Sequence, residues 1–313
     1  AEAFPVQFRA AGVPGVSGTL GNAGPRTTKQ TSYFIMDQIR ALDDKLNILV
    51  GARRDKIESS GQGDASNTSY QAGFTYEVYP GLNFYSLYSE SFRPNSDKID
   101  DQVDPPVVMT FPPSEGEGID FGFKFELLEN TLSGSIAYFN IDRTNILQGN
   151  PAFPRPPGDP PAFLSGLENS QGVEVQMFYT PNDNTQFILS YAHTDSEIKE
   201  SLVVGQTGLP LEQTSPDAVS VTGRHSLGNG FYFGGTWLYR AGPIPQFSVP
   251  RREWAHQKGY SRADIFAAYS TELGGRIHTF RFNMSNVADD TFFDRTERLA
   301  KGREYSFTWG FDI

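Results

Sequence analysis

The stretch GIDFGFKFELLENTLSGSIAYFNID, residues 118–142, predicts the fold of the whole chain. Large apolar residues alternate with small or charged ones up to Leu127, and a second alternating run follows the pair Glu129 and Asn130. Successive side chains of a β-strand point to opposite faces, so each run presents one apolar face and one polar face. The two runs and the short connection between them therefore predict an antiparallel hairpin.

The same unit recurs along the chain. Tight turns are expected near residues 43–45, 80–81, 129–130, 180–184, 228–230 and 273–275, and a single strand, EYSFTWGFDI, ends the sequence. This gives about thirteen strands. Gly and Pro mark the strand boundaries, and a period of 3.6 residues is nowhere sustained, so helix content is expected to be negligible. The fold class is all-β.

The connections between the hairpins indicate where these strands lie. Short turns alternate with long polar segments near residues 57–67, 93–117, 143–170, 196–216, 241–259 and 287–303, so all the long segments lie at one end. This pattern is typical of a transmembrane antiparallel β-barrel. A soluble sandwich shares the period of two. The many large rings, and aromatic residues near strand ends such as Trp237, Tyr239 and Tyr179, favour an apolar face toward lipid.

The last strand carries the same alternation to the end of the chain. We expect its outward residues to meet lipid as the closing strand of the barrel. This ending resembles the C-terminal insertion signal of outer-membrane proteins, although that signal usually finishes in Phe. The lipid-facing set is Tyr305, Phe307, Trp309, Phe311 and Ile313.

Composition excludes several classes of function. A formal net charge of −11 opposes binding to nucleic acid, and the absence of cysteine excludes disulfides and thiolate metal sites. The four histidines have no ligand spacing, so we expect no metal site. The acidic segment 97–104 lacks the spacing of a calcium loop and is expected to be a solvated loop. No catalytic residue is predicted and the chain is not expected to be an enzyme, although barrel lipases and proteases leave that alternative open.

One long segment contains candidate ligand-binding residues. RAGPIPQFSVPRREWAHQKGY, residues 240–260, combines cationic and aromatic side chains that could hold an anionic chelate through charge and ring contacts. Contact with anionic lipopolysaccharide, or simple solvation of the loop, would explain the same composition. The candidates are Arg240, Arg251, Arg252, Trp254 and Tyr260.

Several stretches in order resemble the C-terminal barrel half of TonB-dependent outer-membrane receptors, particularly the siderophore-receptor branch. They are SYFIMDQIRALDDKLNILVGARRD, LYSESFRPNS, EGIDFGFKFELLENTLSGSIAYFNIDRTNI, NSQGVEVQMFYTPNDNTQFILSYAHTDSEI and NMSNVADDTFFD, together with the closing strand. The resemblance covers nearly everything after Gln30. It implies a 22-stranded barrel in the outer membrane of a Gram-negative cell, plugged by an N-terminal domain, that imports ferric siderophores with energy from TonB.

The chain departs from that pattern in its first part. Residues 1–30 are rich in Gly, Pro and Ala and are expected to form an extracellular loop-like segment, with residues 31–313 as the C-terminal part of the barrel. No plug-like segment or TonB box is apparent, and thirteen strands do not close a single-chain barrel, so a fragment is expected. The expected function is TonB-dependent uptake, and a passive pore or adhesion barrel is the alternative. The expected partners are outer-membrane lipid, lipopolysaccharide, a small-molecule ligand such as an iron chelate, and TonB through the missing plug, with no resident cofactor.

Overall fold

The computed structural model describes residues 27–59, 62–150, 152, 154–211, 214–242, 258–295 and 298–312. These residues form strands and turns, and the described part of the chain holds no helix able to cross a membrane. One sheet has thirteen strands, each antiparallel to its neighbours, in the order β1-β2-β3-β4-β7-β8-β9-β10-β11-β12-β13-β14-β17. The predicted number of strands is therefore confirmed.

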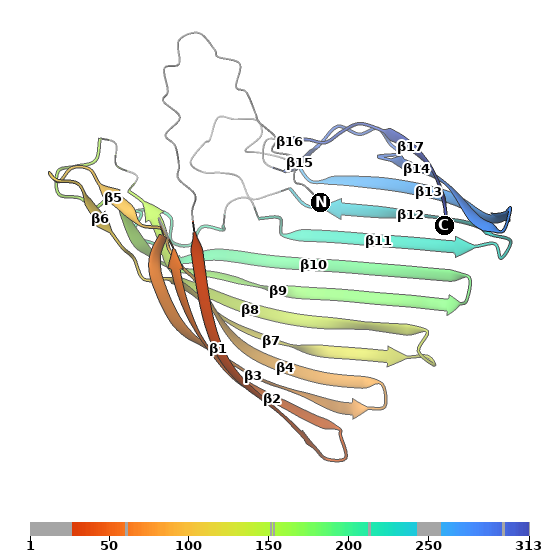
Figure 1. Ribbon diagram of the computed structural model, residues 1–313, viewed down its shortest axis with the longest axis horizontal. Helices are drawn as coiled ribbons and strands as arrows, with labels where there is room; N and C mark the ends of the chain where they lie inside the picture. The colour runs from red at the N-terminus through yellow and green to blue at the C-terminus, as the bar shows by residue number, and fades with distance from the viewer. Residues whose placement is uncertain are drawn as a thin grey trace, which may run out of the picture.

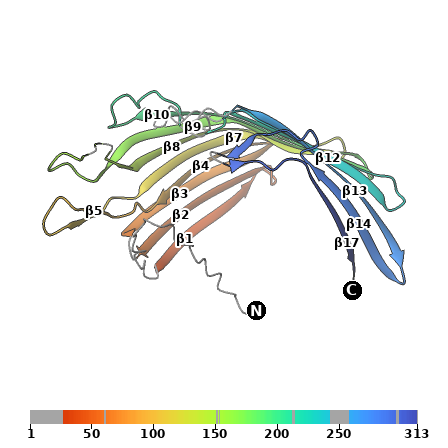
Figure 2. The same ribbon diagram turned by 90° about the horizontal axis from the view of Figure 1, so that it is seen from above.

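The strands lie side by side in chain order (Figure 1), and the sheet curves as one arch with β1 and β17 at its two ends (Figure 2). Its strands are β1 (Thr28–Ala41), β2 (Leu46–Ser59), β3 (Gln62–Tyr79), β4 (Leu82–Arg93), β7 (Ser114–Leu127), β8 (Leu132–Gly149), β9 (Ala162–Asn182), β10 (Thr185–Glu200), β11 (Asp217–Ser226), β12 (Phe231–Arg240), β13 (Tyr260–Leu273), β14 (Arg276–Ser285) and β17 (Glu304–Phe311).

The register places the apolar residues of neighbouring strands on one face. Residues that pair across strands share a face of the sheet. On β4, β7, β8 and β9 one such row is Phe84, Phe123, Ile136 and Val175, and the next row, on the other face, is Asn83, Lys124, Ser135 and Gln176. The sheet thus has one mainly apolar face and one mainly polar face, as the alternation predicts.

The apolar face is bordered by charged residues toward the long loops. On β7 the outward side chains are Phe125, Phe123, Phe121 and Ile119, and the next outward residue toward the long loops is Glu117. Glu90 and Asp142 pair with Glu117 from the two neighbouring strands, so a row of carboxylates borders the apolar band. These four outward residues span about 20 Å along the strand, and the apolar band that they form ends at the charged border, as the lipid-facing band of an outer-membrane barrel does.

The closing strand follows the same rule. β17 pairs with β14, and its four apolar residues share a face with Phe280 and Phe282 of that strand. The rings of Phe280 and Trp309 stack with their centroids 6.5 Å apart. Ile313 lies outside the described residues. No described residue pairs with the free edge of β1 or β17, so the thirteen described strands do not close a barrel, as expected.

The predicted boundaries at the long-loop end are wrong in part. β2 and β3 continue to Ser59 and from Gln62, so most of the expected loop 57–67 is strand, and β8 and β9 similarly shorten the expected loop 143–170. Above the lipid both faces of the sheet are polar, so the alternation disappears while the backbone hydrogen bonds continue. Two small hairpins lie within the long loops: β5 (Lys98–Asp100) with β6 (Val107–Met109), and β15 (Phe293–Arg295) with β16 (Arg298–Leu299). The expected loop-like segment 1–30 lies almost wholly outside the described residues.

Candidate functional site

The polar face of the sheet contains a hollow of about 620 Å³ that is lined by residues from β4 to β13. Strands this far apart can line one hollow only if the polar face is the concave one. The inward side chains that line it include Tyr85, Glu174, Gln176, Ser190, Ser220, Arg240 and Tyr260. The concave face is therefore the wet interior of the barrel.

The floor of this hollow is made by small residues between two opposite charges. The register joins Glu174, Ala192, Ala218 and Arg240 in one row across β9, β10, β11 and β12. Three strand spacings place the Cα atoms of Glu174 and Arg240 about 14 Å apart. Two alanines in succession leave the space between a carboxylate and a guanidinium open. The arrangement can bind a polar ligand that offers an anionic group to Arg240 and hydrogen-bond donors to Glu174.

Two of the predicted ligand-binding residues meet at the rim of the hollow. Arg240 and Tyr260 pair directly across β12 and β13. Arg240 Nε donates to Ser215 Oγ at 3.2 Å, and no described carboxylate forms an ion pair with Arg240. Tyr260 stacks on Phe292, with ring centroids 4.1 Å apart and an interplanar angle of 12°. The other three candidates, Arg251, Arg252 and Trp254, lie outside the described residues.

The loop that carries Phe292 is anchored by a buried asparagine. Asn286 donates its backbone N–H to Asp264 Oδ1 at 2.8 Å and its side-chain amide to the carbonyl of Asp290 at 2.8 Å. Asp264 is also ion-paired with Arg262 at 2.9 Å. Asn286 is 2% exposed. This network gives the stretch NMSNVADDTFFD a structural role, since it holds Phe292 against Tyr260.

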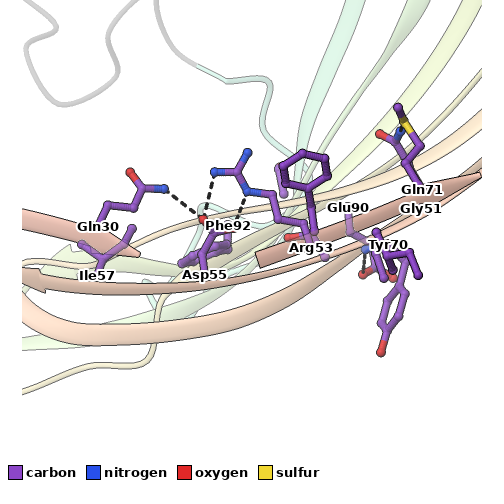
Figure 3. A pocket seen from close by; sticks show the side chains of 15 residues that line it. Gln30, Gly51, Arg53, Asp55, Ile57, Tyr70, Gln71, Glu90 and Phe92 are labelled. Atoms are coloured by element: carbon purple, nitrogen blue, oxygen red, sulfur yellow. Dashed lines mark hydrogen bonds and ion pairs between the residues drawn. The ribbon is translucent and has the colours of Figure 1, made fainter. Parts of the chain in front are cut away.

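A second pocket, of about 490 Å³, lies at the other side of the arch, near the long-loop end of β1 to β4 (Figure 3). Arg53 and Gln30 reach toward Asp55, which is 3% exposed. Arg53 Nε donates to Asp55 Oδ2 at 2.8 Å, and Gln30 Nε2 donates to Oδ1 at 3.0 Å. Asp55 lies above the apolar band, since the adjacent outward residues are Arg54 and Lys56.

Asp55 is held in its ionised form. The hydrogen bond from Arg53, supported by those from Ser32 and Gln30, lowers the pKa of Asp55 to about 2, against the opposing effect of burial. A carboxylate with three donors fixes the Arg53 guanidinium in place. The wall of this pocket is therefore an internally paired surface.

The long loops are joined to each other by an arginine. Arg155, from the connection between β8 and β9, donates to Asp100 and Asp101 of the connection between β4 and β7, each at 2.8 Å. Gln102 Nε2 in turn donates to the carbonyl of Arg155 at 2.7 Å. The Arg155 side chain is 11% exposed and that of Asp100 is 14% exposed. The expectation of a solvated acidic loop at 97–104 is wrong for Asp100, because a cation from a distant loop covers it.

The histidines make separate pairwise contacts. His193 Nδ1 lies 2.8 Å from Asp217 Oδ1, His225 Nδ1 lies 2.9 Å from Thr185 Oγ1, and His278 Nδ1 accepts from Trp309 Nε1 at 3.2 Å. His256 lies outside the described residues. Within the described ranges no three His, Asp or Glu side chains are grouped so that they could hold a metal ion.

Sequence comparison places this architecture among known proteins. The family model of the TonB dependent receptor-like beta-barrel matches residues 3–287. The chain is 24% identical over 244 residues to the metal-pseudopaline receptor CntO of Pseudomonas aeruginosa, a match that covers 76% of this chain and 32% of that receptor. It is 23% identical over 282 residues to the ferripyoverdine receptor of the same species, covering 85% of this chain and 32% of the receptor.

Structure comparison agrees. The crystal structure of BauA, the ferric preacinetobactin receptor from Acinetobacter baumannii, has a TM-score of 0.76 at 18% identity, covering 92% of this chain and 43% of BauA. The chain thus spans about a third of the first two receptors and less than half of BauA. The match to the family model extends over most of the chain and agrees with the thirteen-stranded antiparallel sheet. The chain therefore belongs to the TonB-dependent receptor-like β-barrel family, and its sheet is part of an outer-membrane barrel.

Proposed function

We propose that this chain is the barrel portion of a receptor that imports a ferric siderophore across the outer membrane with energy from TonB. The observation that carries the proposal is the concave-face hollow between Glu174 and Arg240. The relatives named above support it, because their names assign them to metal-pseudopaline, ferripyoverdine and ferric preacinetobactin. These relatives are transport receptors rather than enzymes. In the whole receptor, a plug domain would make the contact with TonB. This contact is part of what we propose for the whole receptor.

The chemistry of the hollow suits an anionic iron chelate. Such chelates bind iron through carboxylate, hydroxamate or catecholate oxygens and present acceptor oxygens at their surface. Arg240 can donate to these oxygens because no described carboxylate neutralises it, and Tyr260 is held in place by Phe292. Glu174 can accept from hydroxyl or amide groups at the other side of the ligand. Outer-membrane lipid and lipopolysaccharide would meet the convex apolar face and its border of carboxylates.

The test is uptake of radioactive iron in a strain that lacks the gene and carries it on a plasmid. We expect growth under iron limitation and uptake of one ferric siderophore, both lost when TonB is deleted. Arg240→Gln should lower the apparent affinity for the chelate, whereas Arg276→Gln, on the outward side of a short turn, should not. Entry that is unaffected by TonB deletion would refute energised transport and favour a passive pore, and a receptor that confers only surface attachment would favour the adhesion barrel.

A further inference from the structure

A cluster of cations and rings lies on the concave face at the short-turn end, away from the Glu174 and Arg240 hollow. Arg224 of β11, Tyr232 of β12, Phe266 of β13 and Arg281 of β14 belong to the polar face by register. Their strands are joined by the turns after Ser226 and Leu273. We refer to these four residues as the arginine–tyrosine cluster.

The two guanidinium groups of the cluster are held by rings. Arg224 Cζ lies 4.6 Å from the centroid of the Tyr232 ring. Arg281 Cζ lies 6.0 Å from the Tyr232 ring and 5.7 Å from the Phe266 ring, and its Nη2 donates to Tyr232 Oη at 3.2 Å. The two rings meet edge to face, 6.3 Å apart at 68°. Both cations are therefore oriented by the same tyrosine.

Small residues beneath the cluster make this packing possible. Gly234 pairs with both Arg224 and Phe266, and a Cβ atom on Gly234 would lie 2.7 Å from Phe266 Cζ. Ala268 lies between Tyr232 and Arg281 in the register and is 2% exposed. A larger residue at either position would separate the rings from the cations. The small residues at these two positions therefore allow the arginines to pack on the rings in a fixed arrangement, which a merely basic surface would not have.

Neither arginine has an acidic partner within the described residues. Both guanidinium carbons lie within 6.0 Å of the centroid of the same Tyr232 ring, so the two cations are neighbours. A ring occupies one flat face of a guanidinium and leaves its edge N–H groups available for an anion. Both arginines are exposed on the concave face, and two guanidinium groups oriented by one ring attract an anion more strongly than either does alone.

We propose that the arginine–tyrosine cluster is a carboxylate-binding site at the short-turn mouth of the barrel interior. The planar fork of arginine matches a carboxylate, and the site stands apart from the ligand hollow, so it does not depend on which chelate the receptor transports. The carboxylate can belong to a solute that passes through the interior or to an acidic side chain of a polypeptide segment that fills it. Both sources present the same group to the two arginines.

The test uses the receptor as it is made in cells, purified from outer membranes in detergent. Citrate serves as the soluble carboxylate probe in calorimetric titrations of the wild type and of Arg224→Gln/Arg281→Gln. Hydrogen–deuterium exchange of the same two proteins reports any interior segment that the cluster holds. Arg276→Gln is the matched control, because Arg276 also lies near a ring, 5.8 Å from Phe311, but on the outward face. Tyr232→Phe keeps the aromatic ring against which both arginines lie and removes only the hydroxyl group that accepts from Arg281.

Three outcomes are distinguishable. If citrate binds the wild type and binds at least about tenfold more weakly to the double variant, with the control unchanged, the source is a solute. If citrate does not bind but an interior segment exchanges at least about tenfold faster in the double variant, the source is a polypeptide. If the double variant matches the wild type in both measurements, the proposal is wrong. Tyr232→Phe should show a smaller effect of the same sign, and it replaces the double variant in both measurements if the double variant does not fold.

Discussion

The long-loop end and the short-turn end of the sheet differ in what their arginine side chains contact. At the long-loop end Arg53, Arg143, Arg155 and Arg262 each bind a carboxylate of the same chain, at 2.8 to 2.9 Å. At the short-turn end Arg224 and Arg281 have no acidic partner among the described residues and lie on aromatic rings. These four arginines of the long-loop end are neutralised within the chain, whereas the two at the short-turn end present their charge toward the interior.

This difference separates two uses of the same residue type. A guanidinium that is paired within its own chain positions the backbone, because removing it leaves a largely buried carboxylate without its partner. A guanidinium on a ring remains available to a partner from outside. Arg240, bonded to Ser215 at the long-loop end, resembles the second kind, and this is why it is the strongest candidate of the predicted ligand residues.

The largest effect is expected where two loops share one cation. Arg155→Met should destabilise the contact between the loops at 94–113 and 154–161 by about 3 kcal/mol, because it leaves the covered carboxylate of Asp100 unpaired. Hydrogen exchange of both loops measures this loss. The paired control compares Asp100 and Asp101, which accept from the same Arg155 nitrogen at the same distance. Their side chains are 14% and 81% exposed. Asp100→Asn should cost more than Asp101→Asn, and equal effects would mean that burial does not set the strength of this contact.

Asp55→Asn should have the next largest effect. The buried carboxylate accepts from Arg53, Gln30 and Ser32, and an amide of the same shape has only one oxygen to offer. We expect the local opening free energy of the β1 and β2 hairpin to fall by about 2 kcal/mol, measured by hydrogen exchange at low denaturant. Glu58→Gln, in an exposed pair with Lys56 on the same strand, is the control and should change this opening free energy much less. A reversed order would contradict the view that the paired end is held by its buried charges.

Arg240→Gln tests the one candidate ligand-binding arginine of the described residues, which lies at the long-loop end without a described carboxylate partner. Since no described carboxylate depends on Arg240, the substitution should leave stability unchanged and weaken binding of the ferric chelate about tenfold. Equilibrium binding of the chelate to purified receptor measures this change. Arg262→Gln has the opposite expected profile, because Arg262 supports Asp264 and through it Asn286. If Arg240→Gln unfolds the loops instead, Arg240 belongs with the paired arginines.

The fold could be predicted because lipid imposes a simple rule on sequence. Each strand inside the membrane alternates strictly, so hairpins such as the one at 118–142 were located with their correct faces. The strand ends above the lipid were missed for the same reason, since Lys56 and Ser66 pair as regular strand residues in a region that is polar on both faces. Polar strand and polar loop have similar compositions and differ only in their long-range backbone pairing.

The candidate site could be predicted only in part. Its residues lie on different strands and are brought together by the pairing register between those strands. Arg240 and Tyr260 were identified from composition, yet their contact depends on pairing between β12 and β13. The opposite charge, Glu174, lies three strands away behind two alanines, and alanine carries no chemical signal in a sequence. The arginine–tyrosine cluster was missed for the same reason, because its four side chains belong to four strands. Arg155 and Asp100 are 55 positions apart, so their pairing is equally invisible.

The smallest expected effect concerns pH at the paired end. Asp55 has a pKa of about 2 in the folded chain, below the value of about 4 for an unperturbed aspartate. A lowered carboxyl pKa stabilises the folded state above the unfolded pKa, and this contribution is lost as pH falls through the folded pKa. The difference in hairpin opening free energy between wild type and Asp55→Asn should therefore be constant above about pH 4 and diminish toward pH 2. Hydrogen exchange between pH 2 and pH 5 measures it, and Glu58→Gln provides the baseline for general acid effects. A difference that stays constant down to pH 2 would show that shape and packing at Asp55, rather than its charge, hold Arg53 in place.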